Sequence, residues 1–179
     1  MSETTRKHKE KAPTKLGFAV FVCSTSRYQE LMKTGKAEDK SGDLIAETLK
    51  RHGHNLVVRR IIPDDESSIK EGVNDALKSQ KVDVIILCGG TGISPTDVTI
   101  ETVRPLLDKE LHGFGEIFRW LSYQAIGSAA IVTRAVAGVI KGKAVFCIPG
   151  SPQAVRLCLE KLILPEAGHI ILHARGKGQ

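Results

Sequence analysis

A continuous apolar run leads directly into a glycine-rich loop in the stretch VDVIILCGGTG, residues 82–92. A short run of β-forming residues such as Val82 to Leu87 is typical of a strand that is buried on both faces. In sheets of parallel strands, ligands bind beyond the carboxyl ends of the strands. The stretch therefore predicts a buried parallel strand that ends at a binding loop.

Strands and helices alternate on the amino-terminal side of this strand. Apolar runs predict strands over residues 17–22 and 55–62, and Pro63 stops the second of them. Helical spacing of apolar residues predicts a short helix around Leu44 to Leu49, ended by Gly53, and a second helix over roughly residues 67–79. This alternation indicates a parallel sheet with helices on its faces. The polar segment between the first strand and the first helix, residues 24–42, is expected to be a long loop that is functional or mobile.

The second half of the chain predicts a different connection. A short helix near Thr99, interrupted around Pro105, and an amphipathic helix that carries Phe114 and Phe118 follow the loop. Two β-like runs, 129–136 and 144–148, then flank a glycine turn and predict a hairpin, which makes the sheet mixed. Ser151-Pro152 is typical of the start of a last helix.

Composition and charge limit the functional classes. The chain has 179 residues and a net charge of +6, and five of its basic residues fall within the first fifteen positions. We expect a disordered basic tail over residues 1–15 and one α/β domain over residues 16–179. The tail has no aromatic residue to stack on a base, so nucleic-acid binding is not favoured. No apolar run has the length of a membrane span and no signal peptide is visible, so a cytoplasmic protein without a membrane partner is expected.

Cysteine and histidine give no motif. The four cysteines are widely spaced and most lie in apolar runs, which indicates buried thiols in a reducing compartment. The six histidines contain no H-E-x-x-H sequence, so no histidine metal site is predicted.

The loop after the third strand has the features of an anion site. Gly89, Gly90 and Gly92 let backbone N–H groups approach an anion, and the hydroxyl of Thr91 is a further donor. The loop fits neither the Walker pattern, which needs a lysine, nor the dinucleotide pattern. A tight turn between a strand and a helix would also explain the glycines.

Asp97 and Asp64 add carboxylates to this anion site. Asp97 follows the glycine loop, and Asp64 follows the proline that ends the second strand. A carboxylate beside a phosphate pocket is repelled unless it holds a cation, and Mg²⁺ fits because it needs few protein ligands when phosphate oxygens supply others. The alternative for both residues is a structural role at a helix start.

Two further strand ends contribute candidates. Pro149, Gly150 and Ser151 combine a glycine with a capped helix start, whose free N–H groups suit a second anion. Ser24 follows the first strand in the same way. A plain turn between strand and helix is the alternative for this second cradle.

With these residues in place, the chain resembles the molybdenum-cofactor biosynthesis family of MogA and MoaB, which is also found in gephyrin and its plant counterpart. The similarity covers nearly the whole chain after Leu16. Its motifs are Gly89-Gly90-Thr91-Gly92 with Asp97-Val98-Thr99, Asp39-Lys40-Ser41-Gly42, Ile62-Pro63-Asp64-Asp65, Gly113-Phe114-Gly115-Glu116 and Ile148-Pro149-Gly150-Ser151-Pro152-Gln153-Ala154. Two positions differ from many members: Cys88 replaces a threonine, and Thr133 replaces a serine.

The resemblance implies a three-layer α/β/α fold with a mostly parallel mixed sheet, assembled as a homotrimer or hexamer. It implies a molybdopterin adenylyltransferase that uses Mg-ATP, releases pyrophosphate and serves molybdenum or tungsten cofactor synthesis, with the metal-insertion protein of the same pathway as a further partner. The family's catalytic aspartates fall on Asp64 and Asp97. Our hypothesis is that Asp97 holds Mg²⁺ on the nucleotide phosphates, whereas Asp64 orients the attacking phosphate or accepts its proton. Nucleotide and substrate binding is assigned to Ser24, Gly89, Gly90, Thr91, Gly92, Glu116, Pro149, Gly150 and Ser151.

One alternative keeps the same fold, namely a non-catalytic molybdopterin-binding or scaffold protein. The presence of both Asp64 and Asp97 argues for the enzyme. The loss of a hydroxyl at Cys88 removes one expected phosphate contact and argues weakly for the scaffold.

Overall fold

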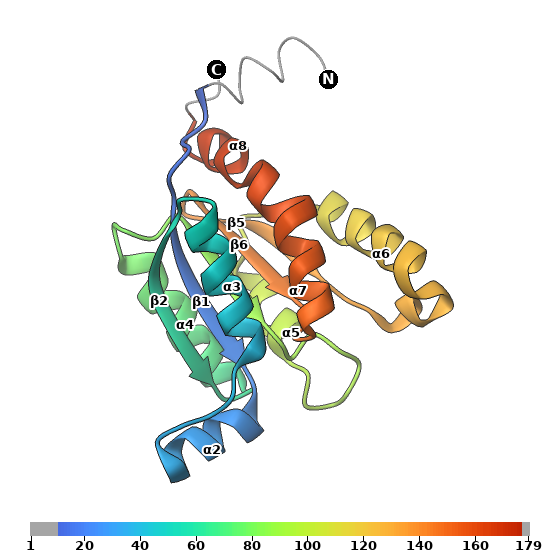
Figure 1. Cartoon of the computed structure of the whole chain (residues 1–179). Helices are drawn as coiled ribbons and strands as arrows, with labels where there is room; N and C mark the ends of the chain where they lie inside the picture. The colour runs from blue at the N-terminus through green and yellow to red at the C-terminus, as the bar shows by residue number, and fades with distance from the viewer. Residues whose placement is uncertain (1–10, 177–179) are drawn as a thin grey trace.

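The apolar run before the glycine loop forms β3 (Val84–Cys88), in which every residue is buried. The computed structural model describes residues 11–176. β3 lies inside a six-stranded sheet of order β2-β1-β3-β6-β5-β4 (Figure 1). β1 (Gly17–Cys23), β2 (Asn55–Ile62), β3 and β6 (Lys143–Ile148) are parallel, whereas β5 (Val136–Ile140) and β4 (Lys109–Glu110) run antiparallel to their neighbours. The predicted mostly parallel, mixed sheet is confirmed.

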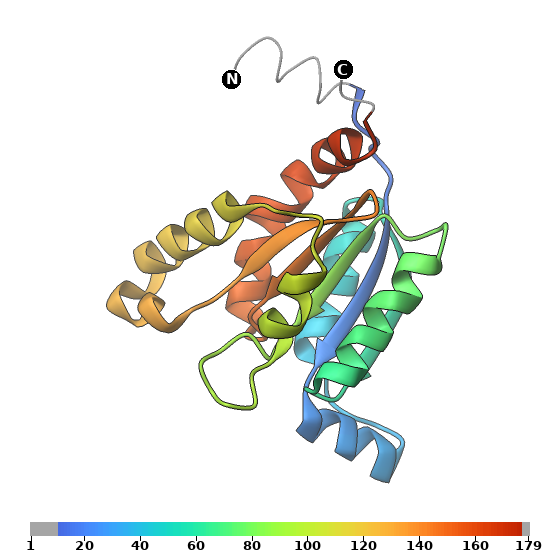
Figure 2. The ribbon, with the colours of Figure 1, turned by 180° about the vertical axis from the view of Figure 1, so that it is seen from behind.

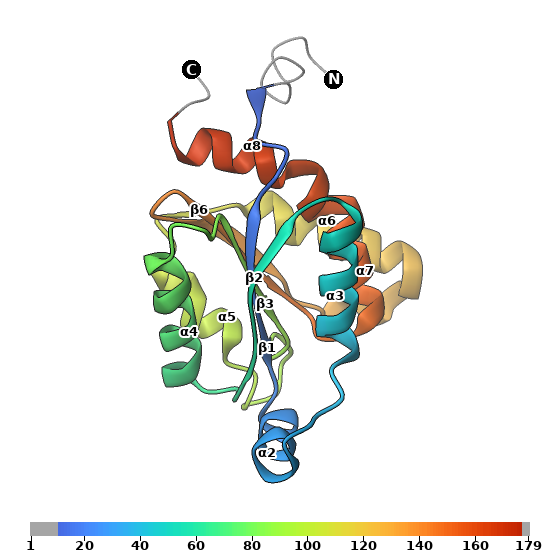
Figure 3. The ribbon, with the colours of Figure 1, turned by 60° about the vertical axis from the view of Figure 1, so that its left-hand side comes forward.

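Helices cover both faces of this sheet, which Figure 3 shows nearly edge-on. One face carries α4 (Glu66–Lys78) and α5 (Thr99–Val103), and the other carries α3 (Lys40–Arg51), α6 (His112–Ile126), α7 (Pro152–Cys158) and α8 (Leu164–Ala174). A π-helical turn, Leu159–Ile163, joins α7 to α8, and 3₁₀ turns follow α5 and α6 at Arg104–Leu106 and Gly127–Val132. The three-layer prediction is therefore confirmed.

Alternating side chains of the central strands fill the two cores. Phe18, Val20 and Val22 of β1 belong to the core under α3, α7 and α8, whereas Ala19 and Phe21 belong to the core under α4 and α5. Because successive residues of a strand point to opposite faces, a strand buried on both sides must be apolar throughout. The continuous apolar runs in the sequence have this physical cause.

The parallel strands bring four loops to one edge of the sheet. The loops after β1, β2, β3 and β6 leave the carboxyl ends of these strands, and the helices that follow them begin there. In Figures 1 and 2 this edge is at the bottom, together with α2 (Thr25–Thr34), while α8 lies at the opposite edge.

Two expectations for the elements are wrong. Residues 24–42 are not one loop, because Thr25–Thr34 forms α2, with Ser24 as its amino-terminal cap and Gly35 at φ 73° as its end. None of the residues of this helix is fully buried, and its apolar side is limited to Tyr28, Leu31 and Met32, so the sequence signal for it is short. The strand predicted over residues 129–136 begins only at Val136, the first residue of β5, because Ile131 and Val132 belong to a 3₁₀ turn and are exposed, by 86% and 51%.

Two further expectations were a disordered tail and the absence of a membrane span. Most of the predicted disordered tail, residues 1–10, lies outside the described residues. Pro13 lies against α8, where Gly168 leaves room for its carbonyl group. Between residues 11 and 176, no helix is long and apolar enough to cross a membrane.

Candidate functional site

The four strand ends enclose an open cleft of about 900 Å³. The loop after β1 contributes Ser24 to Arg27, the loop after β2 contributes Asp64 to Glu66, and the loop after β6 contributes Pro149 and Gly150. The loop after β3 forms the floor, and its lining residues are Gly89, Gly90, Thr91, Gly92, Pro95, Thr96, Asp97 and Val98. Val132, Thr133 and Arg134, which precede β5, complete the wall.

The glycines of the floor are required by close approaches of other groups. Gly89 has φ 105°, and a Cβ there would collide with the backbone carbonyl of Cys23 at the end of β1. Gly90 has φ 61°, and a Cβ there would come within 2.6 Å of Asp64 Oδ2. A Cβ on Gly92 would come within 2.7 Å of Asp97 Oδ2. The glycine loop therefore makes room for two carboxylates as well as exposing backbone N–H groups.

Asp64 is held from three sides. Its own N–H donates to Thr25 Oγ1 at 3.0 Å, and Thr99 Oγ1 donates to its Oδ1 at 3.5 Å. Burial and the charge of Asp97 raise the pKa of Asp64, while hydrogen bonds from Val98 and Thr99 act in the opposite direction. A half-buried carboxyl group with a raised pKa is a better proton acceptor than an ordinary aspartate.

Asp97 closes the loop on itself. Its Oδ2 accepts a hydrogen bond from the N–H of Ser94 at 2.9 Å, and its own N–H donates to the carbonyl of Ser94 at 2.9 Å. Asp64 and Asp97 both line the cleft, and the charge of Asp97 contributes to the raised pKa of Asp64. Two neighbouring carboxylates with a glycine loop between them can hold a cation together with a phosphate.

The second cradle is partly in the cleft. A Cβ on Gly150 would lie 3.3 Å from the Gly89 Cα atom, so only glycine allows the two loops to touch without displacement. Ser41 Oγ donates to the carbonyl of Gly150 at 2.7 Å and fixes this loop to α3. Ser151 caps α7 by accepting from the N–H of Ala154 at 3.3 Å. Its side chain lines a neighbouring cavity and not the cleft itself.

Two other assigned residues behave differently from the rest. Glu116 is exposed on α6 and is not among the residues that line the cleft, so its role stays a prediction. Cys88 is fully buried in the core beneath the sheet, and its Sγ lies 3.8 Å from the carbonyl of Pro149. The side chain at this position points away from the cleft. The exchange of threonine for cysteine therefore removes no contact with a phosphate there.

Three residues of the site were not predicted from the sequence. Thr25 and Thr99 hold Asp64, as described above. Arg134 donates from Nε to the carbonyl of Thr91 at 2.9 Å and forms an ion pair with Glu101 at 2.6 Å, which lowers the pKa of Glu101. Arg134 therefore fixes the glycine loop from the β5 side. Its position after Thr133 in a family motif was the only signal in the sequence.

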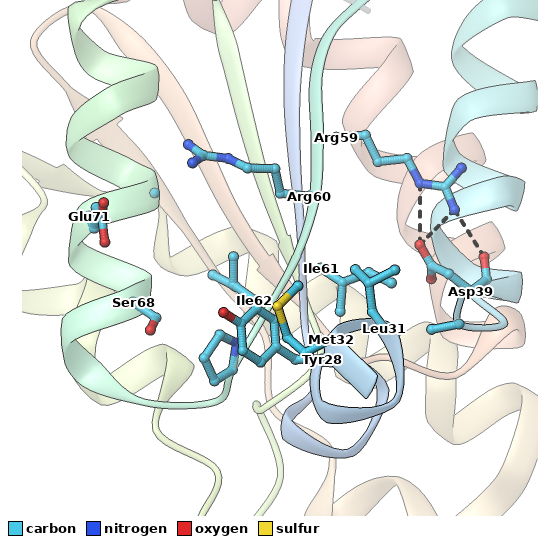
Figure 4. A pocket seen from close by; sticks show the side chains of 13 residues that line it. Tyr28, Leu31, Met32, Asp39, Arg59, Arg60, Ile61, Ile62, Ser68 and Glu71 are labelled. Atoms are coloured by element: carbon cyan, nitrogen blue, oxygen red, sulfur yellow. Dashed lines mark hydrogen bonds and ion pairs between the residues drawn. The ribbon is translucent and has the colours of Figure 1, made fainter. Parts of the chain in front are cut away.

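A second cavity of about 590 Å³ lies on the other side of α2, against β2 and α4 (Figure 4). Tyr28, Leu31 and Met32 of α2 form its apolar wall. Its most buried ion pair joins Arg59 to Asp39 at 2.6 Å, so the positive charge of this arginine is neutralised by the protein itself. The cavity contains none of the glycine-loop residues or the paired carboxylates, so the cleft remains the candidate for phosphate chemistry.

Comparison with known proteins agrees with this geometry. Residues 19–169 match the model of a family described as a probable molybdopterin binding domain. The chain is 47% identical to the molybdenum cofactor biosynthesis protein B of Bacillus cereus over 91% of this chain and 93% of that protein. It is 44% identical to the molybdopterin adenylyltransferase of Pyrococcus furiosus over 94% of this chain and 96% of that protein.

Solved structures agree as well. The tungsten cofactor synthesizing protein MoaB from Pyrococcus furiosus is 43% identical, with a TM-score of 0.82 over 92% of this chain and 99% of that one. Sequence, fold and the arrangement of the strand-end loops thus lead to the same assignment. The chain belongs to the molybdopterin-binding family of molybdenum cofactor biosynthesis proteins that includes MoaB and MogA.

Proposed function

We propose that this protein is a molybdopterin adenylyltransferase that acts in molybdenum or tungsten cofactor synthesis. The observation that carries the proposal is the convergence of Asp64 and Asp97 on one glycine loop at the carboxyl edge of the sheet. Relatives named as adenylyltransferases align over nearly the whole chain. ATP and molybdopterin are the proposed substrates, and pyrophosphate is the second product.

The donor set of the cleft fits Mg²⁺. Within residues 11–176, no three His, Cys, Asp or Glu side chains gather to hold a metal ion by themselves. The cleft instead offers the carboxylates of Asp64 and Asp97, and Mg²⁺ typically binds through one or two carboxylates together with substrate phosphates and water. When bound, the ion would neutralise charge on the phosphates of ATP, and Asp97 is the residue we assign to it.

Adenylyl transfer requires positioning more than covalent chemistry by the protein. An oxygen of the molybdopterin phosphate forms a bond to the α-phosphorus of ATP, and the bond from that phosphorus to the pyrophosphate oxygen breaks. Backbone N–H groups of Gly90 to Gly92 stabilise the charge that develops on the α-phosphate oxygens, whereas the N–H of Gly89 donates to the carbonyl of Ile148. Asp64, whose pKa is raised, orients the attacking phosphate or accepts its proton. Pro149 and Gly150 border the part of the cleft beside Gly89, where we place the second of the two substrate phosphates.

The test is a turnover assay with purified molybdopterin, ATP and Mg²⁺, in which adenylylated molybdopterin is separated and measured. We expect product from the parent protein and a large loss of rate in Asp97→Asn. Binding of molybdopterin by the parent and by Asp97→Asn without product from either would establish the non-catalytic binding protein in place of the enzyme. Asp75→Asn is a matched control, since Asp75 is an exposed aspartate of α4 that pairs with Arg60 outside the cleft.

A homo-oligomer is proposed from an exposed apolar patch. The patch comprises six side chains that are each about half exposed or more, and we call it the α6 patch: Ile117, Trp120, Tyr123, Ile126, Ile131 and Val132. All six belong to α6 or to the 3₁₀ turn that follows it, and exposed apolar side chains grouped in this way mark interaction sites on soluble proteins. The α6 patch supports self-association, with a trimer or a pair of trimers as the proposed state. The cytoplasmic location and the contact with the metal-insertion protein of the same pathway stay predictions.

A further inference from the structure

Two histidines of α8 bring their ring nitrogens together at the edge of the sheet opposite the cleft. His169 Nε2 and His173 Nε2 are 3.0 Å apart, and the two rings meet edge to face with centroids 4.7 Å apart. The residues are four positions apart on one helix, so they lie on the same side of it. This is the histidine spacing of the H-E-x-x-H zinc motif, with Ile170 in place of the glutamate.

The nitrogen separation matches that of two ligands on one metal ion. With metal–nitrogen bonds of about 2.0–2.1 Å, two ligands are roughly 3.3 Å apart in a tetrahedral site and roughly 2.9 Å apart at adjacent corners of a square or octahedron. The observed 3.0 Å lies between these values. The separation of the two nitrogens therefore allows both to bind one ion once the rings turn so that both lone pairs face it.

A carboxylate orients the first histidine. Glu166 Oε2 lies 3.1 Å from His169 Nδ1, one turn earlier on α8. A carboxylate at this nitrogen places the ring proton on Nδ1 and leaves the Nε2 lone pair directed toward His173. Histidine ligands of metal sites almost always have such a partner, which fixes the tautomer and strengthens the ligand.

The pair lies in a hollow that an ion can enter. Both histidines line a cavity of about 490 Å³ between α8 and the β4–β5 edge, where Asp108 and Lys109 supply one negative and one positive charge. His173 is in the last turn of α8, where the helix dipole places partial negative charge. His169 is 24% exposed at its side chain, so the pair is accessible to an ion from solvent.

From this geometry we propose that His169 and His173 form a binding site for a divalent transition-metal ion of the class that prefers imidazole ligands, such as Zn²⁺, Ni²⁺ or Co²⁺. Glu166 is the positioning residue of the site. Water completes the coordination, and His173 transfers its ring proton from Nε2 to Nδ1 when the ion binds. The site is separate from the cleft and from Mg²⁺, so it does not depend on the proposed enzymatic function.

The experiment uses the untagged full-length chain after treatment with a chelator. Zn²⁺ binding is measured by calorimetry, and Co²⁺ is used as a spectroscopic probe because its visible absorption reports nitrogen ligation. We expect one ion per chain. His173→Gln and His169→Gln should each weaken binding by about 10-fold or more, and Glu166→Gln should weaken it by about 10-fold because the orienting carboxylate is lost.

His112→Gln is the matched control. His112 is an exposed histidine that lies 3.4 Å from a carboxylate oxygen of Glu110, much as His169 lies beside Glu166, but within residues 11–176 no second histidine is paired with it. We expect this variant to bind Zn²⁺ like the parent. Equal affinity of His173→Gln and the parent would overturn the proposal, and so would an equal loss in His112→Gln. Circular dichroism of each variant shows that the fold is retained.

Discussion

Gly90→Ala tests whether the glycine loop positions Asp64. A Cβ at this position would lie 2.6 Å from Asp64 Oδ2 and closer still to Asp64 Oδ1 and to Thr99 Oγ1. Ordinary contact between such atoms is about 3.5 Å, so the carboxylate must retreat by about 0.9 Å or more. A displacement of about 1 Å at a reacting group costs about 100-fold in rate. We therefore expect kcat/KM for adenylylation to fall by about two orders of magnitude.

Backbone strain has to be separated from this displacement. Gly90 has φ 61°, and alanine at such a positive φ costs about 1–2 kcal/mol, or roughly 2–8 °C in Tm for a domain of this size. Gly35 provides the control because it has φ 73° at the end of α2, and a methyl group added there would meet no described atom within 4 Å. Gly35→Ala should show the same loss of Tm with unchanged activity.

Product formation from ATP and molybdopterin gives the rates, and differential scanning fluorimetry gives Tm. The reasoning fails if Gly90→Ala keeps more than about a third of the parent kcat/KM, since the predicted shift of Asp64 would then be worth less than a kilocalorie per mole. It also fails if Gly35→Ala loses activity to the same extent, because strain alone would then explain the effect.

Three other substitutions have expected outcomes. The fold raises the pKa of Asp64, so the ionised carboxylate destabilises the protein once the pH exceeds the ordinary aspartate pKa. Asp64→Asn should therefore have a higher Tm than the parent at pH 7. The difference in Tm should vanish below about pH 3.9, which a series of Tm measurements over pH tests. An Asp64→Asn protein that melts lower than the parent at pH 7 would contradict this sign. Arg134→Ala removes the charged donor to the carbonyl of Thr91, and such a hydrogen bond contributes about 1.5–3 kcal/mol. We expect kcat/KM to fall roughly 10- to 100-fold with an unchanged circular dichroism spectrum. An unchanged rate would exclude a role for Arg134. Trp120→Asp, with a charge in the α6 patch, should give a smaller particle by light scattering at unchanged Tm, and an unchanged mass would remove the patch from the interface.

The layers of the fold were predictable because a strand that is buried on both faces must be a continuous run of apolar residues, which is visible in the sequence. β2 was predicted at its observed bounds, and α4 within one residue at each end. α2 was missed because none of its residues is fully buried, and its local signals were only the cap at Ser24 and the short apolar spacing of Tyr28, Leu31 and Met32. Ile131 and Val132 were misassigned to a strand because the apolar residues of an exposed patch have the same composition as those of a buried strand.

The candidate site was predictable where a residue's role follows from its neighbours in the chain. Asp97 is next to the glycine loop, and Asp64 ends a strand that must lie parallel to β3, so both were identified. Thr25 and Arg134 act on residues 39 and 43 positions away. Such contacts depend on how two loops pack together at the edge of the sheet. The pattern of residues within either loop does not predict which residues of the other loop it contacts.

The buried cysteines of the sheet keep their thiols in the protonated form, which is the less reactive one. Cys23 lines the cleft, and burial raises its pKa to about 12, as it does that of Cys88. Because the thiolate and not the thiol attacks sulfur, neither side chain reacts at neutral pH. The proposed substrate carries two sulfur atoms of its own as a dithiolene. A lining thiol that stays protonated resists oxidation, so the cleft presents no oxidised cysteine that the dithiolene sulfurs could attack to form a mixed disulfide.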